Sequence, residues 1–85
     1  MATLDDYKII NNKIELKFSA FIFSKTVVLD FVKDKDKIQK LINIATIALG
    51  GNDDNTLKFH YEDNDIEVNR GMLENIINKI NKKIN

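Results

Sequence analysis

The segment from Lys37 to Gly51 constrains the fold of this chain most, because it carries a helix start, a broad apolar face and a helix stop together. Asp34 or Asp36 can cap its start, and Gly50 followed by Gly51 predicts a left-handed cap at its end. At about 100° per residue, seven apolar side chains fall on one arc of roughly 160°. These side chains are Ile38, Leu41, Ile42, Ile44, Ala45, Ala48 and Leu49. An arc of this width predicts a helix that packs on a large apolar layer.

Ile47 is the exception in this helix, because it falls outside the apolar arc, between Lys40 and Asn43. An apolar residue on an otherwise polar face is a candidate contact for a partner. A loop or the end of the chain could equally cover it within the fold. Both interpretations stay open at the level of sequence.

Four further segments have the alternation or the β-branched content that predicts strands. They are residues 7–10, 14–23, 26–32 and 57–61. Asn11 and Asn12 predict a tight turn between the first two, since asparagine tolerates a positive φ. Ser24 and Lys25 predict the next break. The segment 14–23 has apolar residues on both faces, which predicts a central strand.

Residues 66–70 are ambiguous. Ile66 and Val68 alternate as in a last strand, after which Asn69 could cap a helix. A longer helix through this region would instead contain Gly71. A glycine inside a helix costs about 1 kcal/mol relative to alanine, so the pattern favours the strand.

A second helix is predicted near residues 72–83 from an apolar stripe at helical spacing. The stripe consists of Leu73, Ile76, Ile77, Ile80 and Ile84. Together the elements predict an α+β fold, a two-layer open-faced sandwich with a mostly antiparallel sheet of four or five strands. The two helices, near 37–49 and 72–83, are expected on one face. A chain of this length has an interior for one core, so residues 1–85 are expected to form a single domain.

The composition narrows the classes of function. Thirteen basic and thirteen acidic residues balance, so no overall field attracts nucleic acid or anionic lipid. The sequence has no cysteine, no run of the ~20 apolar residues that span a membrane, and no signal-peptide pattern at its start. We therefore expect a cytoplasmic protein with a protein partner and with no membrane or nucleic-acid contact; a homo-oligomer stays open. The abundance of Ile, Asn and Lys is typical of an AT-rich genome.

Residues that could carry catalysis are scarce. His60 is the only histidine, and no nucleophile or second imidazole accompanies it, so we expect neither enzyme activity nor a cofactor. The run Asp63-Asn64-Asp65 is similar to the start of a calcium loop. It lacks the glycine at the sixth position and the glutamate at the twelfth, so no metal site is expected.

The order of elements in the second part of the chain resembles a known family. It comprises a strand, a charged turn, a helix ending in Leu49-Gly50, a strand at 57–61, the acidic run 62–65 and a final helix. From Thr26 to about Ile80 this order is similar to that of the phosphocarrier protein HPr family. The resemblance implies a small α+β domain that binds other proteins.

The HPr family carries a Gly-Leu-His-Ala-Arg-Pro run whose histidine accepts phosphate. This chain has Asn11 or Lys17 near that position, and Lys40-Leu41-Ile42 near the regulatory Lys-Ser-Ile of the family. The resemblance therefore implies a domain without phosphotransfer, and the first helix of the family would fall in a segment whose alternation predicts a strand. The ungapped register places Ile44 and Ile47 where the family presents exposed apolar side chains to partners.

Two hypotheses about function follow. The first is a non-enzymatic protein-binding module, a degenerate HPr-like domain that docks through the helix at 37–49. Its contact candidates are Ile44, Ile47, Lys40 and Asn43. The alternative is a small inhibitor from a phage or mobile element, whose acidic hairpin mimics nucleic acid. Its surface would comprise Asp53, Asp54, Glu62, Asp63, Asp65 and Glu67. The same acidic residues could simply be solvated turns, since turns select Asp and Asn.

Overall fold

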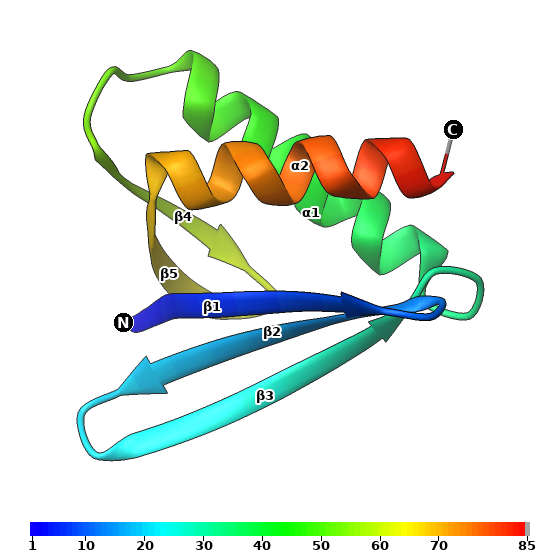
Figure 1. Ribbon diagram of the computed structural model, residues 1–85. Coiled ribbons are helices and arrows are strands. Elements are labelled where there is room, and N and C mark those ends of the chain that lie inside the picture. The colour runs from blue at the N-terminus through cyan, green and yellow to red at the C-terminus, as the bar shows by residue number, and fades with distance from the viewer. Residues whose placement is uncertain (85) are drawn as a thin grey trace.

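The computed structural model describes residues 1–84, which form three strands, a helix, two strands and a second helix (Figure 1). The elements are β1 (Ala2–Ile10), β2 (Lys13–Ala20), β3 (Phe23–Asp30), α1 (Lys35–Gly50), β4 (Thr56–Tyr61), β5 (Asn64–Asn69) and α2 (Arg70–Ile84). The expected α+β class and the two-layer sandwich are confirmed. Five strands form one sheet, and both helices lie on one face of it.

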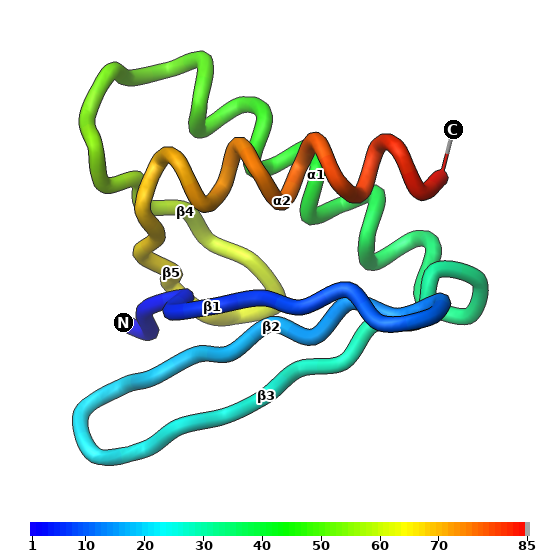
Figure 2. The backbone as a smooth tube through the Cα atoms, viewed as in Figure 1, coloured from blue at the N-terminus to red at the C-terminus, as the bar shows by residue number. Residues whose placement is uncertain are grey.

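The sheet joins a three-stranded meander to a two-stranded hairpin, in the order β3-β2-β1-β5-β4. Neighbouring strands are antiparallel except β1 and β5, which are parallel. Ala2 lies opposite Ile66 and Leu4 opposite Val68 in this parallel pair. Figure 2 shows the start of the chain beside β5. The single parallel pairing thus unites the two halves of the chain in one sheet.

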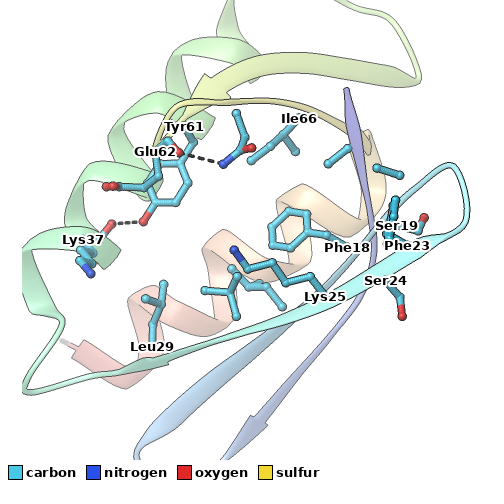
Figure 3. A pocket seen from close by; sticks show the side chains of 15 residues that line it. Phe18, Ser19, Phe23, Ser24, Lys25, Leu29, Lys37, Tyr61, Glu62 and Ile66 are labelled. Atoms are coloured by element: carbon cyan, nitrogen blue, oxygen red, sulfur yellow. Dashed lines mark hydrogen bonds between the residues drawn. The ribbon is translucent and has the colours of Figure 1, made fainter.

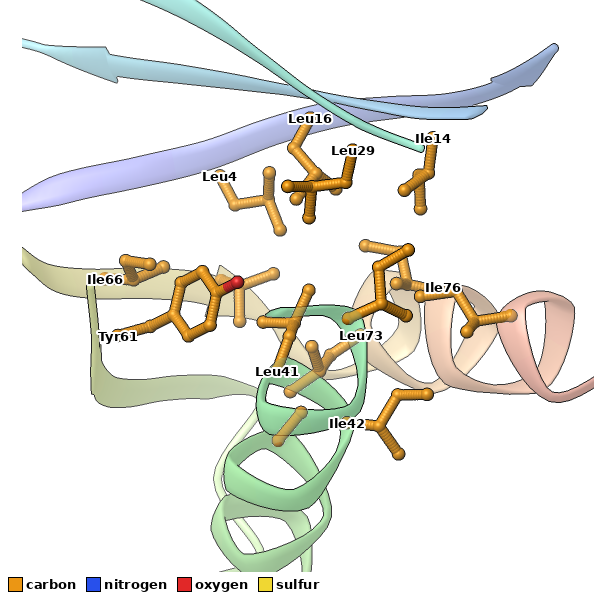
Figure 4. Close-up of a cluster of buried hydrophobic side chains, with 14 of the residues drawn as sticks. Leu4, Ile14, Leu16, Leu29, Leu41, Ile42, Tyr61, Ile66, Leu73 and Ile76 are labelled. Carbon is orange, nitrogen blue, oxygen red and sulfur yellow. The ribbon is translucent and has the colours of Figure 1, made fainter. Parts of the chain in front are cut away.

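One apolar core fills the space between the sheet and the helices (Figure 4). The sheet contributes Ile14 and Leu16, α1 contributes Ile38 and Ala45, and α2 contributes Ile80, each at most 1% exposed. Burial of a Leu or Ile side chain contributes about 1.5–3 kcal/mol. The periodicities of the sequence place these same side chains inward, so the pattern and the core agree.

The turn between β2 and β3 lies at Phe21 and Ile22, so the predicted break at Ser24 and Lys25 is wrong. The predicted strand 14–23 is therefore interrupted near its end, and Ser24 and Lys25 belong to β3. Phe21 has a φ of 55°, in the left-handed region that non-glycine residues rarely adopt.

Strand register explains where this turn falls. Ile14 lies opposite Leu29, and Leu16 lies opposite Val27. Because a shift by one residue would move the buried side chains to the outer face, these pairs fix the two-residue loop at positions 21–22. The predicted central position is nevertheless confirmed, since β2 pairs with a strand on each side.

The ends of α1 differ in detail from the prediction. Gly51 has a φ of −92°, so the left-handed cap is wrong, although its N–H donates to the carbonyl of Ile47 at 3.0 Å. Asp34 is the residue before the first turn of the helix, and Asp36 lies within that turn. The Asp34 carboxylate accepts from the N–H of Asp30 at 2.9 Å instead of capping the helix.

Two asparagine predictions are confirmed. Asn11 has a φ of 55° in the tight turn that it forms with Asn12. At the other position, β5 ends at Asn69, and its Oδ1 atom accepts from the N–H of Met72 at 3.1 Å. Gly71 therefore lies in the first turn of a capped helix, and the strand interpretation of residues 66–70 is correct.

Candidate partner-binding surfaces

The surface of α1 carries the four predicted contact residues at helical spacing. Ile47 is 75% exposed, and Lys40 and Asn43 beside it are exposed as well. Asn43 accepts a hydrogen bond from the side-chain amide of Gln39 at 3.1 Å. Ile44 is only partly exposed and packs against the core. The outward apolar contact in this strip is therefore Ile47, with Ile44 at the edge of the interior.

The six acidic candidates are spread along the β4–β5 hairpin and the loop before it. Asp53 and Asp54 belong to the loop that precedes β4, whereas Glu62 and Asp63 form the turn after it. A strand of six residues spans about 20 Å, so these two pairs are far apart. The structure therefore does not gather the six residues into one cluster.

Basic neighbours further divide this acidic surface. Glu62 lies 3.8 Å from the ammonium group of Lys40, measured between Oε1 and Nζ. Lys58 pairs with Glu67 in the register of the hairpin. The arrangement fits solvated turns better than a single nucleic-acid-like surface, because the acidic residues are spread out and Glu62 and Glu67 have basic neighbours.

His60 lies on the exposed side of β4, where its Nδ1 atom is 3.0 Å from Oδ1 of Asp65. Neither side chain is buried, and both strands place them in register opposite one another. Within residues 1–84 no group of three or more His, Cys, Asp or Glu side chains is arranged to hold a metal ion. The pair gives an isolated surface contact and no assembled nucleophile and base.

A groove of about 420 Å³ lies between the β2–β3 hairpin and the start of α1 (Figure 3). Its apolar lining comes from both hairpins: Leu16, Phe18, Val27, Leu29, Tyr61 and Ile66. Lys25, Lys37 and Glu62 lie among its polar members. The sequence did not predict this groove. Periodicity identifies the inner face of a strand but cannot show that the helices leave part of that face uncovered.

Tyr61 holds the far wall of the groove in place. Its hydroxyl group donates to the carbonyl of Lys37 at 2.9 Å, which ties the end of β4 to the first turns of α1. Burial, with the nearby acids Glu62 and Asp34, raises the pKa of Tyr61 to about 12. The hydroxyl group therefore stays protonated over the neutral range and acts as a structural donor.

Arg70 fixes the loop that joins α1 to β4. Its Nε atom donates to the carbonyl of Asp54 at 2.8 Å, and its Nη2 atom donates to the carbonyl of Asn52. The N–H of Arg70 also donates to the carbonyl of Asn55 at 2.7 Å. The guanidinium group is thus used for local structure, and it ties the loop before β4 to the start of α2.

The tip of the β2–β3 hairpin is the most exposed apolar feature among the described residues. Phe21 is fully exposed, Ile22 is 92% exposed and Phe23 is 72% exposed. The signal in the sequence was the appearance of Phe21 and Phe23 on a face that is otherwise polar. The pattern predicts a central strand over 14–23, whereas Phe21 and Ile22 form an exposed apolar turn and Phe23 begins β3.

The described residues form a small α+β sandwich whose surface exposes apolar side chains at Ile47 and at the tip of the β2–β3 hairpin. No helix within residues 1–84 combines the length and the apolar character needed to cross a membrane. Comparison with known proteins finds no matching family model, no matching curated protein and no matching solved structure.

Proposed function

We propose that this protein is a non-enzymatic protein-binding module that docks a partner through α1, with Ile47 at the centre of the contact. The observation that carries the proposal is the 75% exposure of this isoleucine on an otherwise polar strip. Removing an apolar side chain of this size from water contributes about 2 kcal/mol. A partner that covers Ile47 would therefore bind more tightly than one that leaves it exposed.

The neighbours of Ile47 suit a docking surface. Lys40 and Asn43 precede it by seven and four residues, so the three side chains lie along one side of the helix. Lys40 and Asn43 would supply polar contacts around Ile47, as the polar rim of an interface surrounds its apolar centre. The opposite side of α1 is anchored in the core by Ile38 and Ala45. The helix is therefore held in one position before a partner binds, which reduces the entropy lost on binding.

The proposed kinship with the HPr family concerns the part of the chain that includes α1. The resemblance in sequence covers Thr26 to Ile80, and in this segment β5 is a strand that the resemblance did not include. Residues 13–20 form β2, in the region where the family has a helix. Phosphotransfer is not part of the proposal, because neither Asn11 nor Lys17 can replace a phosphate-accepting histidine.

Substitution of Ile47 by glutamate tests the proposal. The immobilised Ile47→Glu variant should lose proteins that the unchanged chain captures from cells of its source, because a charge replaces the apolar contact. Asn78→Glu, at an exposed position of α2, introduces the same charge elsewhere and should capture the same proteins as the unchanged chain. Capture would be compared by quantitative mass spectrometry.

The thermal midpoint provides the second measurement. Both glutamate variants should keep a midpoint close to that of the unchanged chain, since surface substitutions usually change stability by less than about 0.5 kcal/mol. Unaltered capture by Ile47→Glu would refute docking at this site. A large fall in its midpoint would instead assign Ile47 a role in the fold.

A further inference from the structure

The outer edge of β3 is open along its length. β3 is the last strand of the sheet order and pairs within residues 1–84 with β2 alone. Its eight residues pair with β2 without a register shift, and they include no proline. Proteins usually protect an edge strand with a bulge, a proline, several charges or a covering segment. The only cation within β3 is Lys25, so this edge is ready to accept another strand.

The free backbone groups of this edge can be assigned from the register. The N–H of Phe31 donates to Asn12 at 2.9 Å, toward β2. Backbone groups alternate in direction along a strand, so those of even-numbered residues point away from β2. Among them, the N–H of Asp30 is already bonded to Asp34. The remaining outward residues are Ser24, Thr26 and Val28, which are symmetric about Thr26.

The end of this free edge is set by Asp30. Its Oδ1 atom accepts from the N–H groups of Val32 at 2.8 Å and Lys33 at 3.0 Å. These two hydrogen bonds hold the pKa of the Asp30 carboxyl group below its ordinary value, and the bond from Lys33 has the larger effect. The chain turns away into α1 at this point, so an added strand could pair with β3 only up to about residue 29.

The exposed apolar residues are distributed at both ends of the same edge. Phe21 and Ile22 precede β3, and Val32, which is 73% exposed, follows it. Val28 lies between them and is 49% exposed. An antiparallel copy of the strand would bring the start of each β3 beside the end of the other. The two apolar ends would then cover one another.

We infer that two copies of this chain pair through their β3 edges, antiparallel, with Thr26 opposite Thr26 of the second copy. In this register Ser24 lies opposite Val28, and the three outward residues of each copy all find partners. Each hydrogen-bonded pair in an antiparallel ladder exchanges two bonds. The result is one continuous ten-stranded sheet with both helical layers on the same side.

The inner face of the same register is also complementary. Phe23 of each copy lies opposite Leu29 of the other, at the border of the groove that Leu29 lines. Lys25 lies opposite Val27, so the two Lys25 ammonium groups do not face one another directly. The zero formal net charge means that no overall repulsion opposes the approach of two copies.

A second copy fits this edge better than the other end of the sheet. β4, the opposite edge, presents Lys58 and His60 to solvent, and charged side chains disfavour strand pairing. The docking strip of α1 is separate, because α1 begins near the end of β3 and leads away from it (Figure 1), and Ile47 lies near the far end of the helix. Pairing through β3 is therefore independent of the function proposed above and would leave both α1 surfaces free.

Single-cysteine variants test both the association and its register. The chain has no cysteine, so Thr26→Cys introduces one thiol. Opposed residues in such a pair have Cα atoms about 5.5 Å apart, within the range of a disulfide. Mild oxidation should convert this variant to a covalent dimer. Ser24→Cys is the matched control, since its two thiols would lie about 13 Å apart along the strands and should not link.

Sedimentation equilibrium tests the association without a cross-link. The unchanged chain should show a concentration-dependent dimer. Thr26→Pro removes an outward N–H, which the monomer does not use, and should raise the dissociation constant by about two orders of magnitude. Its thermal midpoint at low concentration should stay close to that of the unchanged chain. Ile47→Glu, on α1, should leave the dissociation constant unaltered.

Three results would overturn the inference. The first is an unchanged chain that stays monomeric at all accessible concentrations. The second is equal cross-linking of Thr26→Cys and Ser24→Cys, which would indicate random collisions or another register. The third is a chain that stays monomeric and binds an extended segment of a different protein at β3, with this binding absent from the Thr26→Pro variant. An unchanged chain that captures a partner through α1 but forms no dimer would refute this inference and leave the proposed function standing.

Discussion

Two of the hairpins in the sheet, β2–β3 and β4–β5, have turns of the same length but of opposite polarity. Each is closed by a two-residue turn that contains a positive φ, at Phe21 in one and at Glu62 and Asp63 in the other. The polar turn is stabilised locally, since the side chain of Asn64 donates to the carbonyl of Glu62 at 2.8 Å. The apolar turn has no such bond, because the side chains of Phe21 and Ile22 carry no hydrogen-bonding group.

This difference shows which of the two turns has residue types that are explained by the conformation of the turn itself. Asp and Asn are favoured in turns because they tolerate positive φ and bond to the backbone. A phenylalanine at a φ of 55° has neither advantage, and its side chain is fully exposed. The polar hairpin is therefore explained by folding alone. The apolar hairpin is not, and this difference is one reason for the proposed pairing of two copies along β3.

The largest effect is expected at the base of the β2–β3 hairpin, where it meets the core. Ile14 is fully buried, so Ile14→Ala should lower the free energy of unfolding by about 2–5 kcal/mol through lost burial and a cavity. Urea denaturation measures this change. Ile22→Ala at the tip should change it by less than about 0.5 kcal/mol. Similar losses at both positions would contradict a hairpin that is anchored at its base and free at its tip.

An intermediate effect is expected at the end of β4. Tyr61→Phe removes the hydroxyl donor to Lys37 and leaves a carbonyl without that partner, which should cost about 1 kcal/mol in thermal or urea unfolding. The change should be seen at neutral pH, where the hydroxyl group is protonated. A stability equal to that of the unchanged chain would show that the bond contributes nothing.

Tyr61 also predicts a pH dependence with a definite sign. Its pKa is raised from 10.0 to about 12 in the folded chain, so above pH 10 the unfolded chain loses this proton first. The stabilisation is complete below pH 10 and is lost as the pH rises toward 12. Tyr61→Phe should remove this part of the alkaline slope in unfolding free energy, and an unaltered slope would assign it to other groups.

A smaller effect is expected from two exchanges at the turns, one of which should stabilise the monomer and the other destabilise it. Phe21→Asn should stabilise the monomer by about 0.5–1 kcal/mol, since asparagine accepts a positive φ more readily. Asp63→Phe, at a φ of 64°, is the reverse exchange and should destabilise by a similar amount. Thermal unfolding at low concentration measures both, and a loss of stability in Phe21→Asn would show that the phenylalanine contributes to the fold itself.

The sequence by itself determined the features that depend on neighbours in the chain. The periodicity of α1 separates Ile38 and Ala45 inside from Ile47 outside, and the structure agrees for all three. The end of β5 and the cap of α2 at Asn69 were likewise predictable, because capping involves residues a few positions apart. Such patterns record local geometry, so they can be found without knowing the rest of the fold.

Only the tertiary structure decided the features that depend on pairing between distant segments. The turn at Phe21 follows from the register of β2 against β3, and the sheet is united by the parallel pairing of Leu4 with Val68. The groove, the open edge around Thr26 and the separation of the acidic residues follow from the same pairings. Alternation along one strand shows which side chains share a face. It does not determine the register of that strand or which strand lies beside it. These are selected by the burial of apolar side chains from segments that are far apart in the chain.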